Sequence, residues 1–367
     1  MSTSNRTTQI RVLVAGGGTA GHIEPALAVA DALTGHFGAQ VICLGTARGL
    51  ETDLVPARGH VLELIDPVPV PRTLSMDLVK LPFRVVKAVA QTVRVIRNNN
   101  LDRVIGFGGY VAAPAYLAAA VTRTPFFVHE ANARAGLANK LGTWLGGTGL
   151  VAYPDCGLKG QFVGMPVRPE LSAVPPDSPA AALRRSEAIE MFGLDPDKKT
   201  VLVTGGSQGA ATLNEAVAGA APAVVDAGFQ ILHAYGKKNP APATIGGWVA
   251  LPFIDRMDMA YAAADLVVCR SGAMTVAEVT ASATPAVYVP LPHGNGEQAQ
   301  NAAAVIAAGA AEIIDNASMN GGVLADTVIG HLRNPAGLAA MSRAAGGCAA
   351  GSAAEDIARM VATGSRS

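Results

Sequence analysis

The chain has 367 residues, half of them hydrophobic, which is enough for two domains of ordinary size. Lysine plus arginine and aspartate plus glutamate both number 28, so the formal net charge is zero and nucleic-acid binding is not expected. The four cysteines are scattered, which predicts no zinc knuckle, and the polar N-terminus predicts no signal peptide. No apolar run reaches 18 residues, which predicts no membrane span and hence a cytoplasmic chain.

Short apolar strands alternate with helices in the first half of the chain. Ile10–Ala15 is a β-branched run that stops at three glycines, and Pro25–Leu33 follows with helical apolar spacing. Further strands are expected at Val41–Leu44, at Val104–Gly109 with an Ala-rich helix after it, and at Phe126–His129. This alternation predicts parallel βαβ units with helices on both faces of a sheet.

The segment Arg72–Asn98 mixes basic and apolar residues, with Asp77 as its single acid. Such a mixture is typical of an amphipathic helix with a solvated basic face, and also of a surface that docks on an anionic membrane. Composition alone favours the solvated face.

The same pattern restarts near residue 200, where "VLVTGGSQGA" (Val201–Ala210) echoes "VLVAGGGTAG" (Val12–Gly21). The segment between the halves, Gly164–Pro179, carries five prolines and is expected to be a linker. The second half has expected strands at Phe229–His233, Leu266–Cys269 and Pro285–Val289, and expected helices at Met257–Ala264, Ala273–Ala283 and Gln298–Ala308. A helix at Ala353–Thr363 closes the chain, so the sequence predicts two Rossmann-like halves.

The glycine run suggests a dinucleotide site, because Gly16, Gly18 and Gly21 spell G-x-G-x-x-G. Such a site needs an acidic residue at the end of the second strand, where this chain has Gly45 and Thr46, with Glu51 lying beyond the expected place. An NAD site is therefore not expected. Glycines at a helix N-terminus still suit a phosphate or an acceptor's pyrophosphate.

Two other motifs are explained by turns. "GGSQG" spells the G-x-S-x-G of a hydrolase elbow at Ser207, with His293 and a nearby aspartate as conceivable partners, but a duplicated phosphate-type turn accounts for it. Asp195-Pro-Asp197 spells D-x-D in a turn before a strand, where these residues are expected for turn chemistry alone. The sequence predicts no metal site.

Polar residues follow two successive strands of the second half. "CRSGAMTVAE" (Cys269–Glu278) offers the N–H groups of a helix start to a diphosphate and the Glu278 carboxylate to ribose hydroxyls. "PLPHGNGEQAQNA" (Pro290–Ala302) offers amides and a carboxylate to sugar hydroxyls. Because strand ends of one parallel sheet meet at one edge, these segments predict a nucleotide-sugar pocket.

Eight stretches, in order from residue 17 to about 303, resemble the MurG family of glycosyltransferases. They are "GGTAGHIEPALAVADAL", "GFGGYVAAPAYLAA", "HEANARAGLANK", "GMPVR", "VTGGSQGAATLN", "FIDRM", "CRSGAMTVAE" and "LPHGNGEQAQNAA". The resemblance implies an α/β GT-B fold, in which two Rossmann-like doubly wound domains face a cleft. It implies an N-terminal domain over residues 1–167 for acceptor and membrane, a UDP-GlcNAc-binding domain over 168–345, and a helix in 346–367 that packs back on the N-terminal domain.

The activity implied is metal-independent, inverting transfer of N-acetylglucosamine from UDP-GlcNAc to O4 of the N-acetylmuramoyl unit of lipid I. The product is lipid II for peptidoglycan synthesis, and hence for cell shape and division. The expected partners are UDP-GlcNAc, lipid I, an anionic membrane surface at the cytoplasmic face and other cell-wall synthesis proteins, with no cofactor and no nucleic acid. Two alternatives stay open, a UDP-GlcNAc 2-epimerase or other GT-B enzyme and a binding module without catalysis.

The resemblance also places contacts on this chain. The donor contacts are Thr19, Ala20, Gly21, Asn132, Arg168, Ser207, Ile254, Ala273, Met274, Thr275, Val276, Ala277, Glu278 and Gln298. The membrane surface is Leu74, Leu78, Lys80, Leu81, Phe83, Arg84 and Lys87. Ala20, Ala131 and Glu297 depart from the residues usual in the family, and the role of Glu297 stays open.

Transfer requires a base for the acceptor hydroxyl and stabilisation of the departing UDP. His22 is the candidate base, because it follows the glycine loop at a helix start, where the dipole keeps an imidazole neutral. A role in hydrogen bonding to sugar or phosphate is the alternative, and His129 and Glu130 are the reserve bases. Arg168 and the N–H groups at Ser271–Ala273 are expected to stabilise the leaving group.

Overall fold

The computed structural model describes residues 9–68, 76–171, 174, 178–206, 209–292, 296–349 and 351–364, with the side chains of 76–80 outside the description. The chain divides into two compact units, each presented separately below. The first comprises Met1–Arg168 and Ser352–Ser367, and the second Pro169–Gly351.

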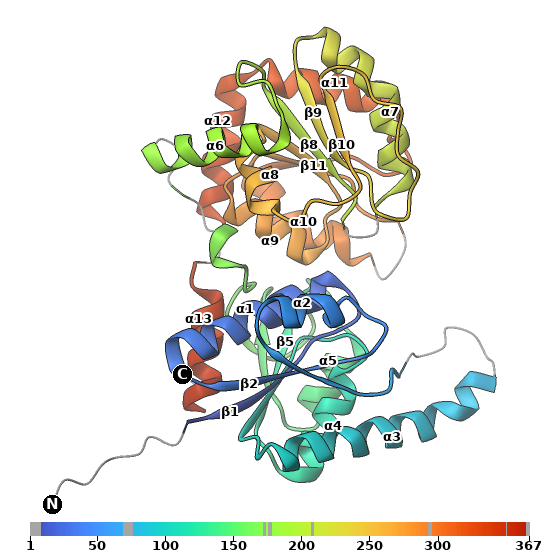
Figure 1. Cartoon of the computed structure of the whole chain (residues 1–367), viewed down its shortest axis with the longest axis vertical. Coiled ribbons are helices and arrows are strands. Elements are labelled where there is room, and N and C mark those ends of the chain that lie inside the picture. Colours follow the sequence, from blue (N-terminus) through green and yellow to red (C-terminus); the bar gives the residue numbers. More distant parts are fainter. Residues whose placement is uncertain are drawn as a thin grey trace, which may run out of the picture. The chain divides into compact units, whose positions relative to one another are not determined.

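The first unit is a parallel sheet covered by helices on both faces (Figure 1). Among its described residues the strand order is β3-β2-β1-β4-β5-β6-β7. The strands are β1 (Arg11–Ala15), β2 (Gln40–Gly45), β3 (Val61–Leu64), β4 (Arg103–Gly106), β5 (Phe126–Glu130), β6 (Thr148–Val151) and β7 (Gln161–Phe162). The helices are α1 (Ala20–Phe37), α2 (Glu51–Ala57), α3 (Met76–Asn98), α4 (Ala112–Thr122), α5 (Leu137–Trp144) and α13 (Ala353–Thr363).

Alternate residues of β1 serve the two faces of this sheet. Val12 and Val14 are buried in the cluster formed with α1 and α13, whereas Leu13 and Ala15 are buried in the cluster formed with α3 and α4. Because both faces of a doubly wound sheet are covered, its strands are continuously apolar. Ile357 of α13 is fully buried in the first cluster, so the end of the chain completes this unit.

The second unit repeats the arrangement, with the order β10-β9-β8-β11-β12-β13 among its described residues. Its strands are β8 (Thr200–Thr204), β9 (Gln230–Ala234), β10 (Trp248–Leu251), β11 (Leu266–Cys269), β12 (Ala286–Tyr288) and β13 (Ala311–Ile313). Its helices are the short η1 (Pro169–Leu171), α6 (Pro179–Phe192), α7 (Ala211–Asp226), α8 (Met257–Ala263), α9 (Ala273–Ala281), α10 (Glu297–Ala307), α11 (Gly321–Leu332) and α12 (Pro335–Gly347).

The predicted α/β fold of two Rossmann-like, doubly wound halves is confirmed. The largest difference in an element is α1, which begins at Ala20 rather than at Pro25, because the extended Thr19 forms the N-cap and Pro25 lies inside the helix. The expected strand at Val104–Gly109 ends at Gly106, since Gly108 and Gly109 take positive φ angles of 93° and 77°. In the described part of the chain, no helix is long and apolar enough to cross a membrane.

Candidate functional site

In each sheet the strand order reverses beside the first strand, between β1 and β4 and between β8 and β11. Ligands of open α/β sheets bind outside the carboxyl ends of the strands at such a point. The candidate residues of the first unit lie after β1, at the end of β5 and beyond it, and after β7, and those of the second unit follow β10, β11 and β12. The topology therefore gathers each group at one edge of its own sheet.

The loop after β1 leads directly into α1. Gly18 has a φ of +90°, and the exposed Thr19 caps α1 in an extended conformation without a side-chain hydrogen bond. Ala20 and Gly21 form the start of the helix. The three predicted contact residues thus lie where backbone N–H groups of a first helical turn are available.

His22 is held in one orientation by the loop after β4. Its Nδ1 lies 2.9 Å from the carbonyl oxygen of Phe107, and a Cβ on Gly108 would lie 3.0 Å from the His22 ring. A carbonyl accepts hydrogen bonds, so Nδ1 carries the proton and Nε2 of the neutral ring keeps its lone pair. Burial lowers the pKa of His22, while the Phe107 hydrogen bond and the charge of Glu130 oppose that shift. His22 therefore has the form that a general base requires.

Glu130, one reserve base, is a structural acceptor. Its buried carboxylate accepts hydrogen bonds from the backbone N–H of Asn132 (2.9 Å), from that of Gly136 (3.0 Å) and from Nδ2 of Asn139 (2.8 Å). The hydroxyl of Tyr116 donates in turn to Oδ1 of Asn139 at 2.9 Å. This network fixes the turn that carries Asn132, a predicted donor contact.

His129, the other reserve base, is fully buried. Its Nε2 lies 3.1 Å from the carbonyl oxygen of Gly164, and burial lowers its pKa to about 4. A ring without exposed surface does not meet an acceptor hydroxyl, so His129 joins β5 to the segment before Arg168.

Arg168 closes the first unit beside α1. Its Nε lies 3.6 Å from the carboxylate of Glu24, which also pairs with Arg58 at 3.0 Å. Arg58 in turn pairs with Asp31, which lies 2.6 Å from Nε2 of His60. The sequence analysis missed Glu24, although its place two residues after His22 in a helical pattern puts it at the same end of α1.

Glu51 is the second residue that sequence analysis missed. Its carboxylate has no exposed surface and accepts the N–H of Gly18 (3.1 Å), the N–H of Thr46 (2.8 Å) and the Thr46 hydroxyl (2.9 Å). A carboxylate turned inward in this way does not reach a ribose, so Glu51 does not supply the acidic residue that a dinucleotide site needs.

In the second unit, α9 begins without a side-chain cap. Gly272 is its N-cap, in an extended conformation, and the preceding Ser271 is fully buried with an Oγ that finds no hydrogen-bond partner among the described residues. Arg270 donates to the carbonyl oxygen of Val289 at 2.9 Å and to Oδ1 of Asn316 at 2.6 Å, which ties the end of β11 to the end of β12. The first N–H groups of α9 are thereby held at a fixed place.

The predicted contact residues along α9 differ in how far they are exposed. Thr275 and Ala277 keep exposed surface, whereas Val276 packs in the core beneath the helix. Glu278 is buried, with Oε2 3.3 Å from the hydroxyl of Tyr261. Ile254 is 4% exposed and packs in the core. Ala273 and Met274 are likewise mostly buried.

Gln298 lies in the first turn of α10. Its Oε1 accepts the N–H of Leu291 at 2.9 Å, which leaves the amide N–H₂ for a ligand. Asn301, one turn further, is buried and donates to the carbonyl oxygen of Ser271 at 3.3 Å. That hydrogen bond holds the start of α10 close to the start of α9, and a single pocket requires the two to be close.

Helix α3 carries the described part of the predicted membrane surface. Phe83 is 78% exposed and Val86 is 67% exposed, whereas Leu81 packs partly buried against the core. Lys87 Nζ pairs with Asp66 at 2.6 Å, and Arg84 is partly exposed. Of the predicted membrane surface, Leu74 and the side chains of Leu78 and Lys80 lie outside the described residues. The predicted donor contact Ser207 also lies outside them.

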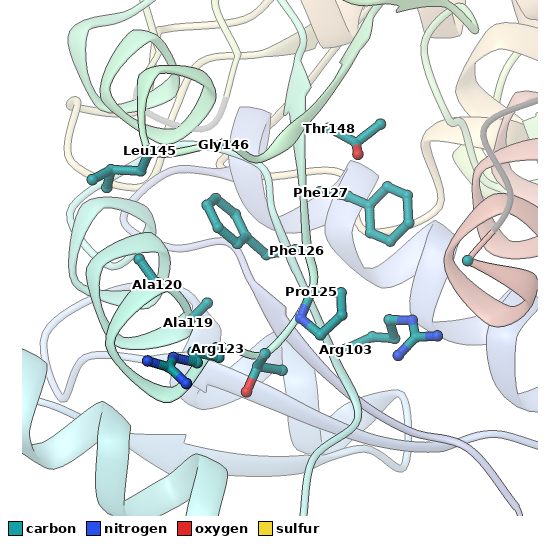
Figure 2. Close-up of a pocket in the computed structure, with 12 residues that line it drawn as sticks. Arg103, Ala119, Ala120, Arg123, Pro125, Phe126, Phe127, Leu145, Gly146 and Thr148 are labelled. Carbon is teal, nitrogen blue, oxygen red and sulfur yellow. The ribbon is translucent and has the colours of Figure 1, made fainter.

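A pocket of about 430 Å³ lies at the opposite, amino-terminal edge of the first sheet (Figure 2). In this view Phe126 and Phe127 turn to opposite sides, with Arg123 on the side of the former and Arg103 on the side of the latter. Helices α4, α5 and α13 all end here, and cations are favourable beside helix C-termini. Helix ends thus account for the arginines, and this pocket lies at the sheet edge opposite to the candidate residues of the first unit.

The D-x-D segment forms a local turn. The N–H of Asp197 donates to Oδ1 of Asp195 at 3.0 Å, and Lys198 pairs with Asp195 at 3.6 Å. In the parts of the chain that are described, no three His, Cys, Asp or Glu side chains group as metal ligands would.

Comparison with known proteins agrees with this geometry. Residues 12–146 match the glycosyltransferase family 28 N-terminal domain, and residues 200–361 match the family's C-terminal domain. The chain is 59% identical over 354 residues to a UDP-N-acetylglucosamine–N-acetylmuramyl-(pentapeptide) pyrophosphoryl-undecaprenol N-acetylglucosamine transferase of Corynebacterium efficiens, covering 96% of this chain and 97% of that one. A protein of the same name from Rhodococcus jostii is 53% identical over 369 residues, covering 96% and 95%.

Solved structures give the same result. The structure of Acinetobacter baumannii MurG matches with a TM-score of 0.73 and 30% identity, over 96% of this chain and 99% of that one. A calicheamicin glycosyltransferase matches with a TM-score of 0.65 at 17% identity, over 95% and 98%, which shows the shared fold alone. The two-domain architecture, the matched domains and the relatives agree: the chain belongs to glycosyltransferase family 28.

Proposed function

We propose that the chain transfers N-acetylglucosamine from UDP-GlcNAc to O4 of the N-acetylmuramoyl unit of lipid I, giving lipid II for peptidoglycan. The identity of 59% to a transferase of that name, over 96% of this chain, carries the proposal. The structure supports it with a neutral histidine at the edge of one sheet and, at the edge of the other, the start of α9, which has no side-chain cap and whose helix carries Glu278.

The transfer inverts the anomeric carbon by direct displacement. O4 of the acceptor attacks C1 of the donor sugar while the bond from C1 to the diphosphate oxygen breaks. The proton of the O4 hydroxyl passes to Nε2 of His22, whose Nδ1 is already committed to Phe107. His22 becomes an imidazolium, and Glu130 is the nearby charge that favours this form.

The departing UDP carries the electron pair of the broken bond. We assign its stabilisation to the first N–H groups of α9 and to the guanidinium of Arg168. Glu278 takes the ribose hydroxyls, the Ile254 backbone takes the uracil, and Gln298 takes hydroxyls of the transferred sugar. In the first unit, Thr19–Gly21 and Asn132 contact the donor sugar.

The deciding experiment measures transfer of radiolabelled GlcNAc from UDP-GlcNAc to a lipid I analogue. We expect a β-linked disaccharide product and turnover that EDTA leaves unchanged, since we propose a metal-independent reaction. Epimerisation of UDP-GlcNAc without an acceptor would instead support a 2-epimerase, and donor binding without either product would support a binding module.

The variant His22→Ala tests the base. We expect kcat to fall by about 10²–10⁴-fold while the dissociation constant of UDP is nearly unchanged, because the proton acceptor is lost and the nucleotide contacts remain. His36→Ala, at the exposed end of the same helix, is the matched control and should behave as wild type. Unchanged turnover of His22→Ala would remove the base assignment.

The pH profile tests the same assignment independently. Burial lowers the pKa of His22 from 6.5, so the neutral, proton-accepting ring predominates above pH 6.5 and disappears only as the pH falls through the lowered value. We therefore expect kcat/KM to be independent of this group above pH 6.5 and to fall tenfold per pH unit below its pKa. A change in activity with its midpoint at pH 7 or above, present in the wild type and absent in His22→Ala, would contradict this.

The variant Glu278→Ala tests the donor site. Hydrogen bonds to a charged group contribute about 1.5–3 kcal/mol, so we expect KM for UDP-GlcNAc to rise about 10- to 100-fold. The variant should also lose the preference of the wild type for UDP-GlcNAc over its 2′-deoxyribose analogue. Glu190→Ala, on the exposed side of α6, serves as the control. Retained discrimination would place the ribose elsewhere.

We further propose that α3 attaches the protein peripherally to an anionic membrane at the cytoplasmic face. The exposed Phe83 and Val86 beside Arg84 and Lys87 support this. We expect Phe83→Glu to weaken sedimentation with phosphatidylglycerol vesicles by about tenfold, because it removes apolar area and adds a repelled charge. Leu183→Glu, at an apolar residue of α6 that is 62% exposed, should bind as wild type. Equal loss in both variants would argue against α3 as the docking surface.

A further inference from the structure

The glycine loop after β1 already holds an anion of its own. The Glu51 carboxylate is completely buried and receives three hydrogen bonds, one from the N–H of Gly18 at 3.1 Å and two from Thr46 at 2.8 and 2.9 Å. Among the described residues, the hydrogen bonds to its two oxygens all come from N–H and O–H donors, which suits a carboxylate as an acceptor. Among the described residues it forms no ion pair, so these hydrogen bonds are its compensation.

The surrounding glycines make room for this carboxylate. A Cβ on Gly49 would lie 1.8 Å from Oε2 of Glu51, and one on Gly45 would lie 2.5 Å from its Cγ. A Cβ on Gly17 would lie 3.0 Å from Oε1. In a phosphate-binding loop, glycines allow the backbone to approach a bound anion. Here three glycines from two loops approach a side chain instead.

We propose that Glu51 takes the place of a bound phosphate beneath this loop, so that Gly17 and Gly18 do not bind a diphosphate and the loop is fixed as a support for His22. Glu51 is thus a positioning residue. On this proposal the pyrophosphate expected at this loop makes no contact with Gly17 and Gly18, because the Gly18 N–H is occupied and a second anion beside a buried carboxylate is repelled.

The connection from Glu51 to His22 runs through the backbone. Gly18 precedes Thr19, whose carbonyl oxygen accepts the N–H groups of His22 at 3.0 Å and Ile23 at 3.1 Å. A Cβ on Gly16 would lie 2.5 Å from the carbonyl oxygen of His22, so the loop and the first turn of α1 are in close contact. Movement of Gly18 would therefore displace the His22 ring from Phe107.

The first test follows the Gly18 amide by NMR in the deuterated full chain, which requires no turnover. In the wild type, inorganic pyrophosphate should leave the Gly18 amide resonance unmoved. In Glu51→Ala, formate should shift it saturably, because formate refills the vacated carboxylate position. A saturable pyrophosphate shift at Gly18 in the wild type would overturn the proposal, and so would the absence of any formate effect in a folded Glu51→Ala.

The second test measures transfer and rests on the proposed function. We expect the isosteric Glu51→Gln to lower kcat about a hundredfold, because His22 is displaced, while KM for UDP-GlcNAc changes little. Formate should restore a large part of the turnover of Glu51→Ala and none of that of His22→Ala. Asp102→Asn is the control, since Asp102 also accepts a backbone N–H, that of Arg11, at the opposite end of β1.

These outcomes separate the two proposals. A wild type without transferase activity would defeat the proposed function and leave the NMR test of Glu51 in force. If Glu51→Ala does not fold, Glu51→Gln carries the test, and wild-type kcat in that variant would overturn the positioning role.

Discussion

Two turns built from glycine meet at the carboxyl edge of the first sheet, and the candidate base depends on their contact. A Cβ on Gly109 would lie 2.2 Å from the carbonyl oxygen of Gly17, so no side chain fits between the loop after β1 and the loop after β4. This approach brings Phe107 within 2.9 Å of the His22 ring and so selects its tautomer. The glycine run therefore allows the two loops to pack together, and this packing sets the tautomer of the candidate base.

In the second unit a close approach joins the loops after the first two strands, β8 and β9. A Cβ on Gly209 would lie 2.4 Å from the carbonyl oxygen of Tyr235, and the side chain packed against Gly209 is Asn239. In the first unit the corresponding loop after the second strand supplies the carboxylate of Glu51. The duplicated turn thus packs against the carboxylate of Glu51 in the first unit and against the neutral amide of Asn239 in the second.

Much of the fold follows from the sequence, because apolar runs that end in glycines mark buried parallel strands. Leu266–Cys269 and Ala353–Thr363 have the same bounds in sequence and structure. The weak edge strands β3 and β7 were missed, since exposed edge residues such as Val61 and Phe162 give no continuous apolar pattern. The roles of Glu51 and Glu24 were missed because each depends on a partner far away in the sequence, Gly18 and Arg168 respectively. Motif spacing places a residue near a site, but it does not say whether its side chain turns toward the ligand or into the loop.

The charges around His22 also bear on why a histidine can act there. A base must be neutral before the reaction and charged after the proton moves, so burial alone would help the first state at the expense of the second. The Glu130 carboxylate offsets the cost of burying the charged ring. It is buried, is not ion-paired with any described residue, and is held in place by Asn139 and by the turn at Asn132. A fixed negative charge in a poorly solvated region stabilises the imidazolium as it forms and requires no reorganisation of the surroundings. The hydrogen bonds that hold the Glu130 carboxylate in place are therefore what suit it to support the proposed base.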